Sequence, residues 1–316
     1  MGFTITGGVS ISGGVSLLPP GGSPSPTPSG VSNGYATGGN TPLGSSDTIF
    51  QFPFSSDSNA TDVGNLSESR YGGAGQSSTE NGYTSGGGFP AVSTVDKFPF
   101  VSNGNATDVG DLTLARMYVT GQSSDQFGYS SGGFNSPGQR WNNIIDKFPF
   151  SSDANASDVG DLSVSKMYGS GQNSATHGYD STGNYSGGDL SRIDKFSFAS
   201  DGNATNVGTL SVAATASAGN SSSDNGYNSS GNTGFNLINK FPFSSESSGS
   251  DVGDLTVSRG ALAGQSSAAN GYLTGGGPDS SNNGTIIEKF PFVSDGNATD
   301  VGDLTESRSL QAGQQG

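Results

Sequence analysis

Large apolar residues recur along this chain in short groups separated by polar stretches. The first phenylalanine of a Phe-Pro-Phe or closely related triplet occurs six times, 45 to 50 residues apart, at Phe52, Phe98, Phe148, Phe196, Phe241 and Phe290. A valine, a leucine and a glycine follow at constant distances in every unit, and a Gly-Tyr pair follows in five of them. All variation in length falls between Gly-Tyr and the next phenylalanine. A repeat of short, strand-like pieces at this period is typical of a β-propeller or a β-solenoid.

Each unit predicts four strands. In one unit, strands a, b, c and d are expected at Tyr71–Ser78, Asn81–Gly87, Ser93–Phe100 and Ala106–Thr113. Turns rich in glycine, asparagine, aspartate and serine separate them. In another unit, Ile145 lies on the opposite face of strand c from Phe148. Both faces of strand c therefore need apolar neighbours, as they do in a blade packed between two other blades.

The two ends of the repeat region complement each other. The first unit starts at strand b, with Ser32–Gly39, and the last unit stops after strand a, with Arg308–Gly316. A closed ring needs this complementarity, because pairing of the two ends in one blade locks the circle, whereas an open solenoid does not. We therefore expect an all-β fold, a six-bladed β-propeller with four strands per blade, closed by both termini. Its axis is expected to be lined by the Gly-Gln-Ser segments of strand a.

Residues 1–32 follow a different pattern. Apolar and polar residues alternate over residues 1–18, as in a strand with one apolar face, through Ile5, Val9, Ile11, Val15 and Leu17. Residues 19–32 are rich in proline, glycine and serine and predict a stiff linker, which leaves residues 33–316 for the propeller. Because the first segment carries no charge that would protect it against edge pairing, we expect it to bind a partner or assemble an oligomer. The alternative is a frayed end.

The order of these signals resembles the kelch repeat. The kelch unit has a Gly-Gly after its second strand, then a strand ending in an aromatic turn, a strand with a tryptophan, and an arginine. In this chain "GYTSGG", "DKFPF", "NATDVGDLT" and "SR" occupy those places. The kelch tryptophan is missing, and Val63 and its equivalents stand near its position. The resemblance covers residues 33–316 and implies a propeller.

The wording of the repeat, "KFPFxSDxNATDVGDLT", also resembles repeats in virion structural proteins of phages, especially marine ones. This resemblance implies a non-enzymatic appendage or fibre of a capsid or tail, made in the host cytoplasm and attached to other virion proteins by its N-terminal segment. A host glycan or surface protein is then the candidate ligand. Two alternatives remain open: an extracellular adhesion or protein-binding module of a cell surface, and a carbohydrate-active propeller enzyme.

Composition narrows the function further. The net charge is −15 with only 12 lysines and arginines, so the basic face of a nucleic-acid binder is missing. With no cysteine and one histidine, His177, neither a thiolate site nor a histidine-cluster metal site is expected, and no catalytic constellation emerges. We therefore expect no enzyme activity. No stretch is long and apolar enough to predict a membrane span.

A basic residue lies four positions after the repeated leucine in every unit but one. The fourth unit has Ala214 at this position, and it also has Asn206 where the others have aspartate. Because both charges are missing together, the pattern predicts structural pairs: Arg70 with Asp62, Arg116 with Asp108, Lys166 with Asp158, Arg259 with Asp251, and Arg308 with Asp300. Buried arginine is normally matched with carboxylate. The alternative is a ring of arginines that grips an anion.

The "SDGNATD" loops between strands c and d contain an Asp-x-Asn start like that of a calcium loop. The residues concerned are Asp201, Asn203, Asp295 and Asn297. They lack the distant acidic residue that an EF-hand needs, and aspartate and asparagine also make turns by bonding their own backbone. We therefore expect plain hairpin turns and no cofactor, with Ca²⁺ as the alternative.

The b–c loop is the segment that varies in length from unit to unit. A rigid scaffold that holds variable loops is a common way to build a binding surface. Because the strands alternate in direction, the b–c and d–a connections emerge on the same face. The longest b–c loop carries the chain's one tryptophan, so the predicted partner-binding residues are Trp141, Arg140, Phe134, Arg192 and Phe235. The alternative is that Trp141 only covers a blade edge.

Overall fold

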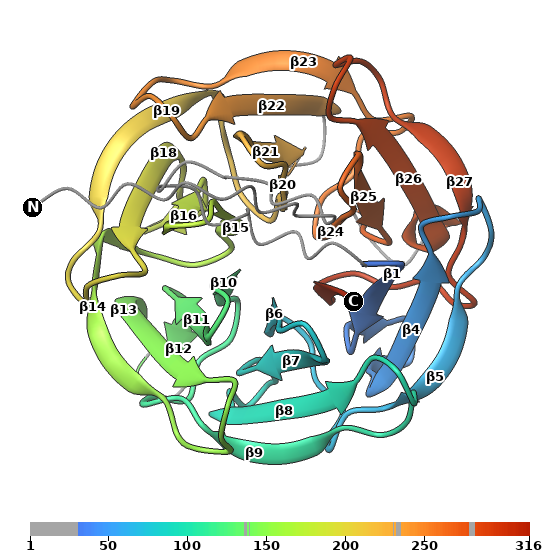
Figure 1. The fold of residues 1–316 in the computed structure, drawn as a ribbon, viewed down its shortest axis with the longest axis horizontal. Helices are drawn as coiled ribbons and strands as arrows, with labels where there is room; N and C mark the ends of the chain where they lie inside the picture. The colour runs from blue at the N-terminus through green and yellow to red at the C-terminus, as the bar shows by residue number, and fades with distance from the viewer. Residues whose placement is uncertain (1–30, 136–137, 139, 230, 232–234, 278–281) are drawn as a thin grey trace, which may run out of the picture.

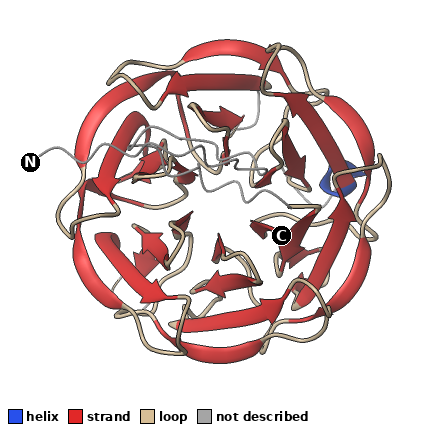
Figure 2. Ribbon diagram, viewed as in Figure 1, coloured by secondary structure: helices blue, strands red, loops and turns tan. Residues whose placement is uncertain are grey.

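Six β-sheets stand around a central axis like the blades of a propeller (Figure 1). The computed structural model describes residues 31–135, 138, 140–229, 231, 235–277 and 282–316. Within them the fold is all-β, apart from one 3₁₀ turn at Asn282–Thr285 (Figure 2). The predicted fold, a six-bladed propeller with four strands per blade, is confirmed. The predicted anchor residues of the 1–18 segment lie outside the described residues.

Every blade runs from an inner strand a to an outer strand d, and all neighbouring strands are antiparallel. Blade 1 contains β28 (Ala312–Gln315), β1 (Asn33–Thr37), β4 (Thr48–Pro53) and β5 (Thr61–Asn65). Blade 2 contains β6 (Ala74–Ser77), β7 (Asn81–Ser85), β8 (Thr94–Pro99) and β9 (Thr107–Asp111). Blade 3 contains β10 (Thr120–Ser123), β11 (Phe127–Ser131), β13 (Arg140–Pro149) and β14 (Ser157–Lys166).

The second half of the ring repeats this order. Blade 4 contains β15 (Ser170–Asn173), β16 (His177–Ser181), β18 (Gly188–Ser197) and β19 (Thr205–Ala214). Blade 5 contains β20 (Ala218–Ser221), β21 (Asn225–Ser229), β22 (Leu237–Pro242) and β23 (Ser250–Asp254). Blade 6 contains β24 (Ala263–Ser266), β25 (Asn270–Thr274), β26 (Ile286–Pro291) and β27 (Thr299–Asp303). Short strands in b–c loops are β2 (Asn40–Thr41), β3 (Gly44–Ser45), β12 (Phe134–Asn135) and β17 (Asn184–Tyr185).

Blade 1 is built from both ends of the repeat region. Its inner strand, β28, pairs with β1 in a register that places Gly34 opposite Gln315. Gly316 and Asn33 then exchange two backbone hydrogen bonds, of 2.8 and 3.0 Å, where the a–b turn of another blade would be. The ring is therefore closed by strand pairing, as the complementary ends predict.

The Gly-Tyr and Phe-Pro-Phe residues pack the blades against one another. The glycine leaves room for the first phenylalanine of its own blade, because a Cβ on Gly82 would overlap the ring of Phe98. The tyrosine stacks on the second phenylalanine of the next blade, with ring centroids 4.5 to 4.9 Å apart in all six contacts. Such pairs contribute about 0.5–1.5 kcal/mol each beyond their burial. Burial also raises the pKa of Tyr83, Tyr129 and Tyr227 to about 12.

Strand a lines the axis, as predicted, and closes two rings of contacts around a central cavity of about 130 Å³. In one ring, a backbone N–H in each inner strand donates to a side-chain oxygen of the next, at 3.0 to 3.3 Å, through Ser77, Ser123, Asn173, Ser221, Ser266 and Gln315. In the other, six glycines lie so close that a Cβ on each would overlap the carbonyl of its neighbour: Gly75, Gly121, Gly171, Gly219, Gly264 and Gly313. Only glycine fits these six axial positions.

A third ring closes the axis where the d–a connections enter the inner strands. Six residues there have φ between 56° and 67°. Each donates its backbone N–H to the carbonyl of the one before it, over 2.6 to 3.0 Å: Gly72, Tyr118, Tyr168, Ala216, Ala261 and Leu310. Left-handed backbone is unfavourable for residues other than glycine, so the closed circle of hydrogen bonds offsets a local cost.

Candidate functional site

Four of the five buried basic residues pair across a blade boundary, and none pairs with the aspartate of its own unit that was predicted. The d–a connection carries Arg70 from blade 1 into blade 2, where its guanidinium lies 2.9 Å from the carboxylate of Asp96 on β8. Asp62, the predicted partner, is exposed on β5 and accepts the N–H of Gly64 at 3.1 Å beside a β-bulge. The predicted pairing was wrong because the d–a connection takes the arginine away from its own outer strand.

The other predicted aspartates are not the partners either. Three more pairs cross a boundary: Arg116–Asp146 (2.6 Å), Lys166–Asp180 (3.1 Å) and Arg259–Glu288 (2.9 Å). Arg308 instead pairs with Glu306 of its own d–a connection and lies 4.4 Å from the ring centre of Phe50. Asp108, Asp158, Asp251 and Asp300 each accept the N–H of the glycine two residues later, as Asp62 does. The five basic side chains are only 0–2% exposed. They therefore cannot form the alternative, a ring of arginines that grips a bound anion.

The fourth unit lacks the buried base, and the next blade lacks the acid that would pair with it. Ala214, the last residue of β19, occupies the position that Arg116 has in its own unit. In blade 5, Asn239 on β22 occupies the position of Asp146. Asn239 accepts hydrogen bonds from the backbone and hydroxyl of Ser211, as Asp146 does from Thr113. Where the buried base is missing, the matching acid on strand c of the next blade is therefore missing too.

A second set of pairs joins strand c of each blade to the c–d loop of the next. Five are ionic: Lys97–Asp153, Lys147–Asp201, Lys195–Glu246, Lys240–Asp295 and Lys289–Asp57. The sixth is neutral on both sides, with Asn103 donating to Gln51 at 3.3 Å. These acids are 38–67% exposed, so each pair contributes little to stability.

The calcium candidates belong to these contacts between blades. Asp201 lies 2.5 Å from Lys147, and Asp295 lies 2.9 Å from Lys240. The side-chain oxygens of Asn203 and Asn297 accept the backbone N–H of Asp161 and Asp254 in the preceding blades, at 3.0 Å. Within the described ranges, no group of three or more His, Cys, Asp or Glu residues converges as metal ligands would. These contacts give the c–d loops a structural role, which is to join each blade to the preceding one.

Blades 3 and 4 differ from the other blades at the end of the ring where the b–c and d–a connections emerge, which we call the b–c face. Strands β13, β14, β18 and β19 are ten residues long, against five or six for strands c and d elsewhere. The extensions of β13 and β18 pair with β12 and β17 to form two raised hairpins. The propeller scaffold therefore carries a locally built-up surface on one side.

An aromatic cluster joins these two hairpins. Trp141 on β13 contacts Phe134 on β12 at 5.9 Å between ring centroids, and Tyr185 on β17 at 6.0 Å, both edge to face. Nearer the axis, Tyr118 stacks on Tyr168 at 4.0 Å, so aromatic contacts cross the boundary between blades 3 and 4 twice. Burial raises the pKa of both of these tyrosines.

The other predicted binding residues are distributed around this cluster. Arg140 precedes Trp141 on β13 and is exposed. The Arg192 guanidinium, on β18, donates to Ser163 Oγ at 2.7 Å and lies 3.8 Å from Asp194. Phe235 is 38% exposed and belongs to the b–c connection of blade 5. The cluster therefore unites Trp141 with Phe134, while Phe235 sits in another blade.

Three aromatic residues at the boundary between blades 3 and 4 were not predicted: Tyr118, Tyr168 and Tyr185. The first two occur in a Met-Tyr pair directly after the buried base, as "RMY" and "KMY". Only the units of blades 2 and 3 carry this pair, so the departure from the repeat was the available signal. Tyr185 stands in the variable loop and gave no signal beyond its residue type.

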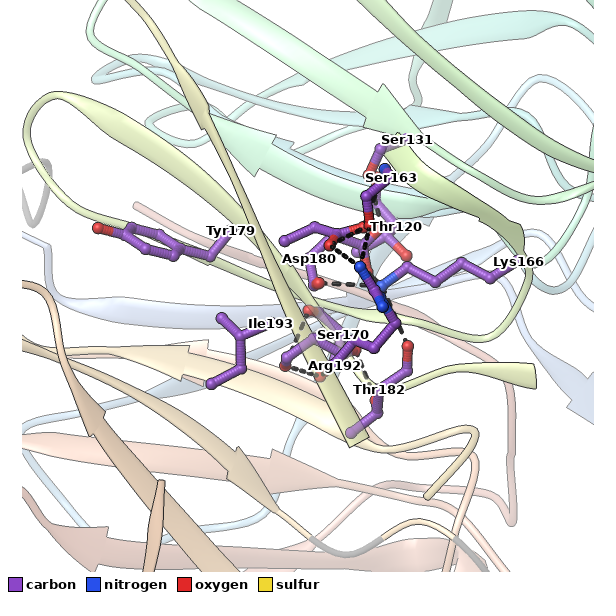
Figure 3. A network of polar contacts seen from close by, with 12 residues as sticks. Thr120, Ser131, Ser163, Lys166, Ser170, Tyr179, Asp180, Thr182, Arg192 and Ile193 are labelled. Atoms are coloured by element: carbon purple, nitrogen blue, oxygen red, sulfur yellow. Dashed lines mark hydrogen bonds and ion pairs between the residues drawn. The ribbon is translucent and has the colours of Figure 1, made fainter. Parts of the chain in front are cut away.

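A polar network lies between blades 3 and 4 (Figure 3). Lys166 Nζ donates to the carbonyls of Asp180 and Thr182, at 2.9 and 3.1 Å, and pairs with the Asp180 carboxylate. Ser131 Oγ donates to the same carboxylate at 2.8 Å. Burial raises the pKa of Asp180, and the nearby Lys166 opposes this effect. Asp194, opposite Asp180 in the register of β16 and β18, is equally buried.

His177 lies far from the cluster along its blade. It begins β16, at the a–b turn and thus on the opposite face of the ring, with Nδ1 2.8 Å from Thr176 Oγ1. Burial lowers its pKa, with a smaller effect from Lys195. The chain's one imidazole is therefore not placed to act on a ligand at the b–c face.

The N-terminal segment joins the ring on this opposite face too. Strand b starts at the a–b turn, so Val31 and Ser32, which precede β1, lie at the end of the ring away from Trp141. Gly316, which follows β28, lies beside them, since its carbonyl accepts the N–H of Ser32 at 2.9 Å.

No protein-family model matches the chain, and no curated protein matches it either. The resemblances to kelch repeats and to phage virion proteins thus depend on the repeat residues alone. Among the described residues, no helix is long and apolar enough to cross a bilayer.

Proposed function

We propose that the protein is a non-enzymatic structural component of a phage particle, an appendage of its capsid or tail. Its N-terminal segment attaches it to other virion proteins, and a kelch-like propeller presents its b–c face to the host surface. One observation carries this proposal. The repeated residues are used in contacts between blades, whereas residues that differ between units form the aromatic cluster on the b–c face.

The two faces of the ring suit the two proposed roles, attachment to the particle and recognition of the host surface. The described chain enters the ring at Val31 and Ser32, on the face opposite Trp141, so attachment through the preceding segment suits a partner on that side and leaves the b–c face free for recognition. The apolar alternation of the segment favours strand addition to a partner, and the proline-rich linker keeps the propeller at a distance. The assignment to a phage rests on the resemblance of the repeated sequence. The proposed recognition role rests on the position of the aromatic cluster on the b–c face.

The test is to purify particles from an infected culture and to search them for this protein by mass spectrometry. We expect the full-length chain in the particles and expect a chain reduced to residues 33–316 to be absent from them while still folding. Incorporation of the shortened chain at the full-length level would show that the anchor lies elsewhere. Detection only in the envelope of uninfected cells would overturn the virion role in favour of a cell-surface adhesion module.

A further inference from the structure

The positive charges of the chain are distributed very unevenly. Of the 12 lysines and arginines, five are the buried bases of the d–a connections and five are the lysines of strand c. The two that remain are Arg140 and Arg192. Both lie on strand c of the raised hairpins, in blades 3 and 4. In a chain of net charge −15, the positive groups outside the repeat pattern are thus gathered beside the one tryptophan.

Arg192 lies on the same face of blade 4 as Tyr185 of the aromatic cluster. Tyr185 stands opposite Gly188 in the register of β17 and β18, and side chains an even number of residues apart on a strand share one face. Tyr185 and Arg192 therefore project from the same face of blade 4. That face looks toward blade 3, since Arg192 reaches Ser163 there and Tyr185 contacts Trp141.

The surface between the two hairpins offers an aromatic ring, Tyr185, next to a partly exposed cation, Arg192, which also pairs with the buried Asp194. Tyr185 is 46% exposed, and the side chain of Arg192 is 36% exposed. The negative faces of Tyr185 and Trp141 attract polarised C–H groups, such as those on the flat side of a pyranose ring. The Arg192 guanidinium pairs well with a carboxylate.

We propose that this surface binds an acidic saccharide, with a sugar ring against Tyr185 and Trp141 and its carboxylate at Arg192. The inference rests on the recognition role proposed above, and it does not depend on which particle carries the protein. A nucleic acid is disfavoured, because binding along its backbone calls for many basic contacts, whereas a single carboxylate needs only Arg192. A protein partner would call for a broader apolar contact than one tryptophan and its ring neighbours supply.

The test measures the affinity of the full-length protein for a soluble oligomer of uronic acid, by calorimetry or by NMR. The matched ligand is the same oligomer with its carboxyl groups reduced to alcohols. We expect the acidic oligomer to bind at least about tenfold more tightly, the contribution of one charge-assisted pair. Arg192→Gln should remove this difference, and Tyr185→Ala should weaken both ligands by about tenfold.

Two control variants separate a directed site from general charge or hydrophobicity. Lys289→Gln removes the same charge from β26 in blade 6, and Phe89→Ala removes an aromatic ring that is 70% exposed in the b–c loop of blade 2. Both should leave the affinity within about twofold. Arg192→Lys keeps the charge and should retain part of the preference, which guards against misreading a folding defect.

Several results would overturn the inference. Equal affinity for the acidic and the reduced oligomer removes the role of Arg192, and an equal loss in Lys289→Gln reduces the effect to surface charge. Binding of neither oligomer removes the saccharide site. That last result leaves the virion role intact, because detection of the protein in particles tests it separately.

Discussion

At the scale of single residues, buried opposite charges are paired across four of the six blade boundaries. Arg116 and Asp146, both 0% exposed, form one such pair, and Ala214 with Asn239 is the uncharged version supplied by the chain itself. Leaving one member of a buried pair without its partner is strongly destabilising, whereas exchanging both members together is not. The uncharged pair Ala214–Asn239 therefore indicates which double substitution a charged boundary should tolerate.

Replacing Arg116 with alanine should lower the free energy of unfolding by about 3–5 kcal/mol, because Asp146 remains buried without its base. The double variant Arg116→Ala/Asp146→Asn copies the Ala214–Asn239 boundary and should recover more than half of that loss. Urea denaturation of the wild type, both single variants and the double variant measures the coupling. A double variant no more stable than Arg116→Ala would contradict the assignment.

His177 gives a pH-dependent prediction. Burial holds its pKa below the ordinary value of 6.5, so the folded state favours the neutral ring. The stability from this group is therefore present above pH 6.5 and is lost as the pH falls from there through the lowered pKa of the folded state. We expect the single histidine resonance to titrate below 6.5, and His177→Gln to show a smaller loss of stability across that window. An equal loss in the variant would assign it to other groups.

At the scale of strands and turns, the inner strands meet so closely that they admit no side chain at their centre. A Cβ on Gly171 would overlap the carbonyl oxygen of Gly121, which belongs to the backbone of β10 and cannot move aside alone. Gly188, in the raised hairpin of blade 4, has its nearest atom 3.7 Å from such a Cβ. The two glycines provide a matched comparison.

Gly171→Ala should destabilise the propeller by about 2 kcal/mol or more, in the range of overpacked cores. Gly188→Ala should change the stability by less than about 0.5 kcal/mol, as expected for a surface site. Thermal unfolding of the two variants is the measurement. Similar melting temperatures for both would show that the axial contact is looser than described.

The strand order was predictable because the repeat marks it, and the expected strands differ from the observed ones mainly at their ends. The pairing of charges was not, because a single unit does not reveal that the d–a connection crosses into the next blade. From the sequence, Asn206 was expected to be the counterpart of Ala214. In the structure the counterpart is Asn239, one unit later. Aromatic residues such as Trp141 were found because they break the repeat, whereas Tyr185 became visible only through its contact with blade 3.

At the scale of the whole molecule, circular closure is the property on which the anchor and the recognition face both depend. Joining Gly316 directly to Val31 would place three residues between Gln315 and Asn33, the number that separates Ser77 from Asn81 in blade 2. A circular permutant with this junction, opened next to Leu43, which is 100% exposed, should therefore rebuild a natural a–b turn. We expect it to fold with a melting temperature within a few degrees of the wild type.

The most direct test of the closed ring removes the strand that closes it. Deletion of residues 308–316 takes away β28, which pairs with β1 and completes the axial rings through Gly313 and Gln315. Thermal unfolding should show a melting temperature lower by about 10 °C or more for the deleted chain, with the permutant near the wild type. A deleted chain that melts at the wild-type temperature would contradict closure by both termini.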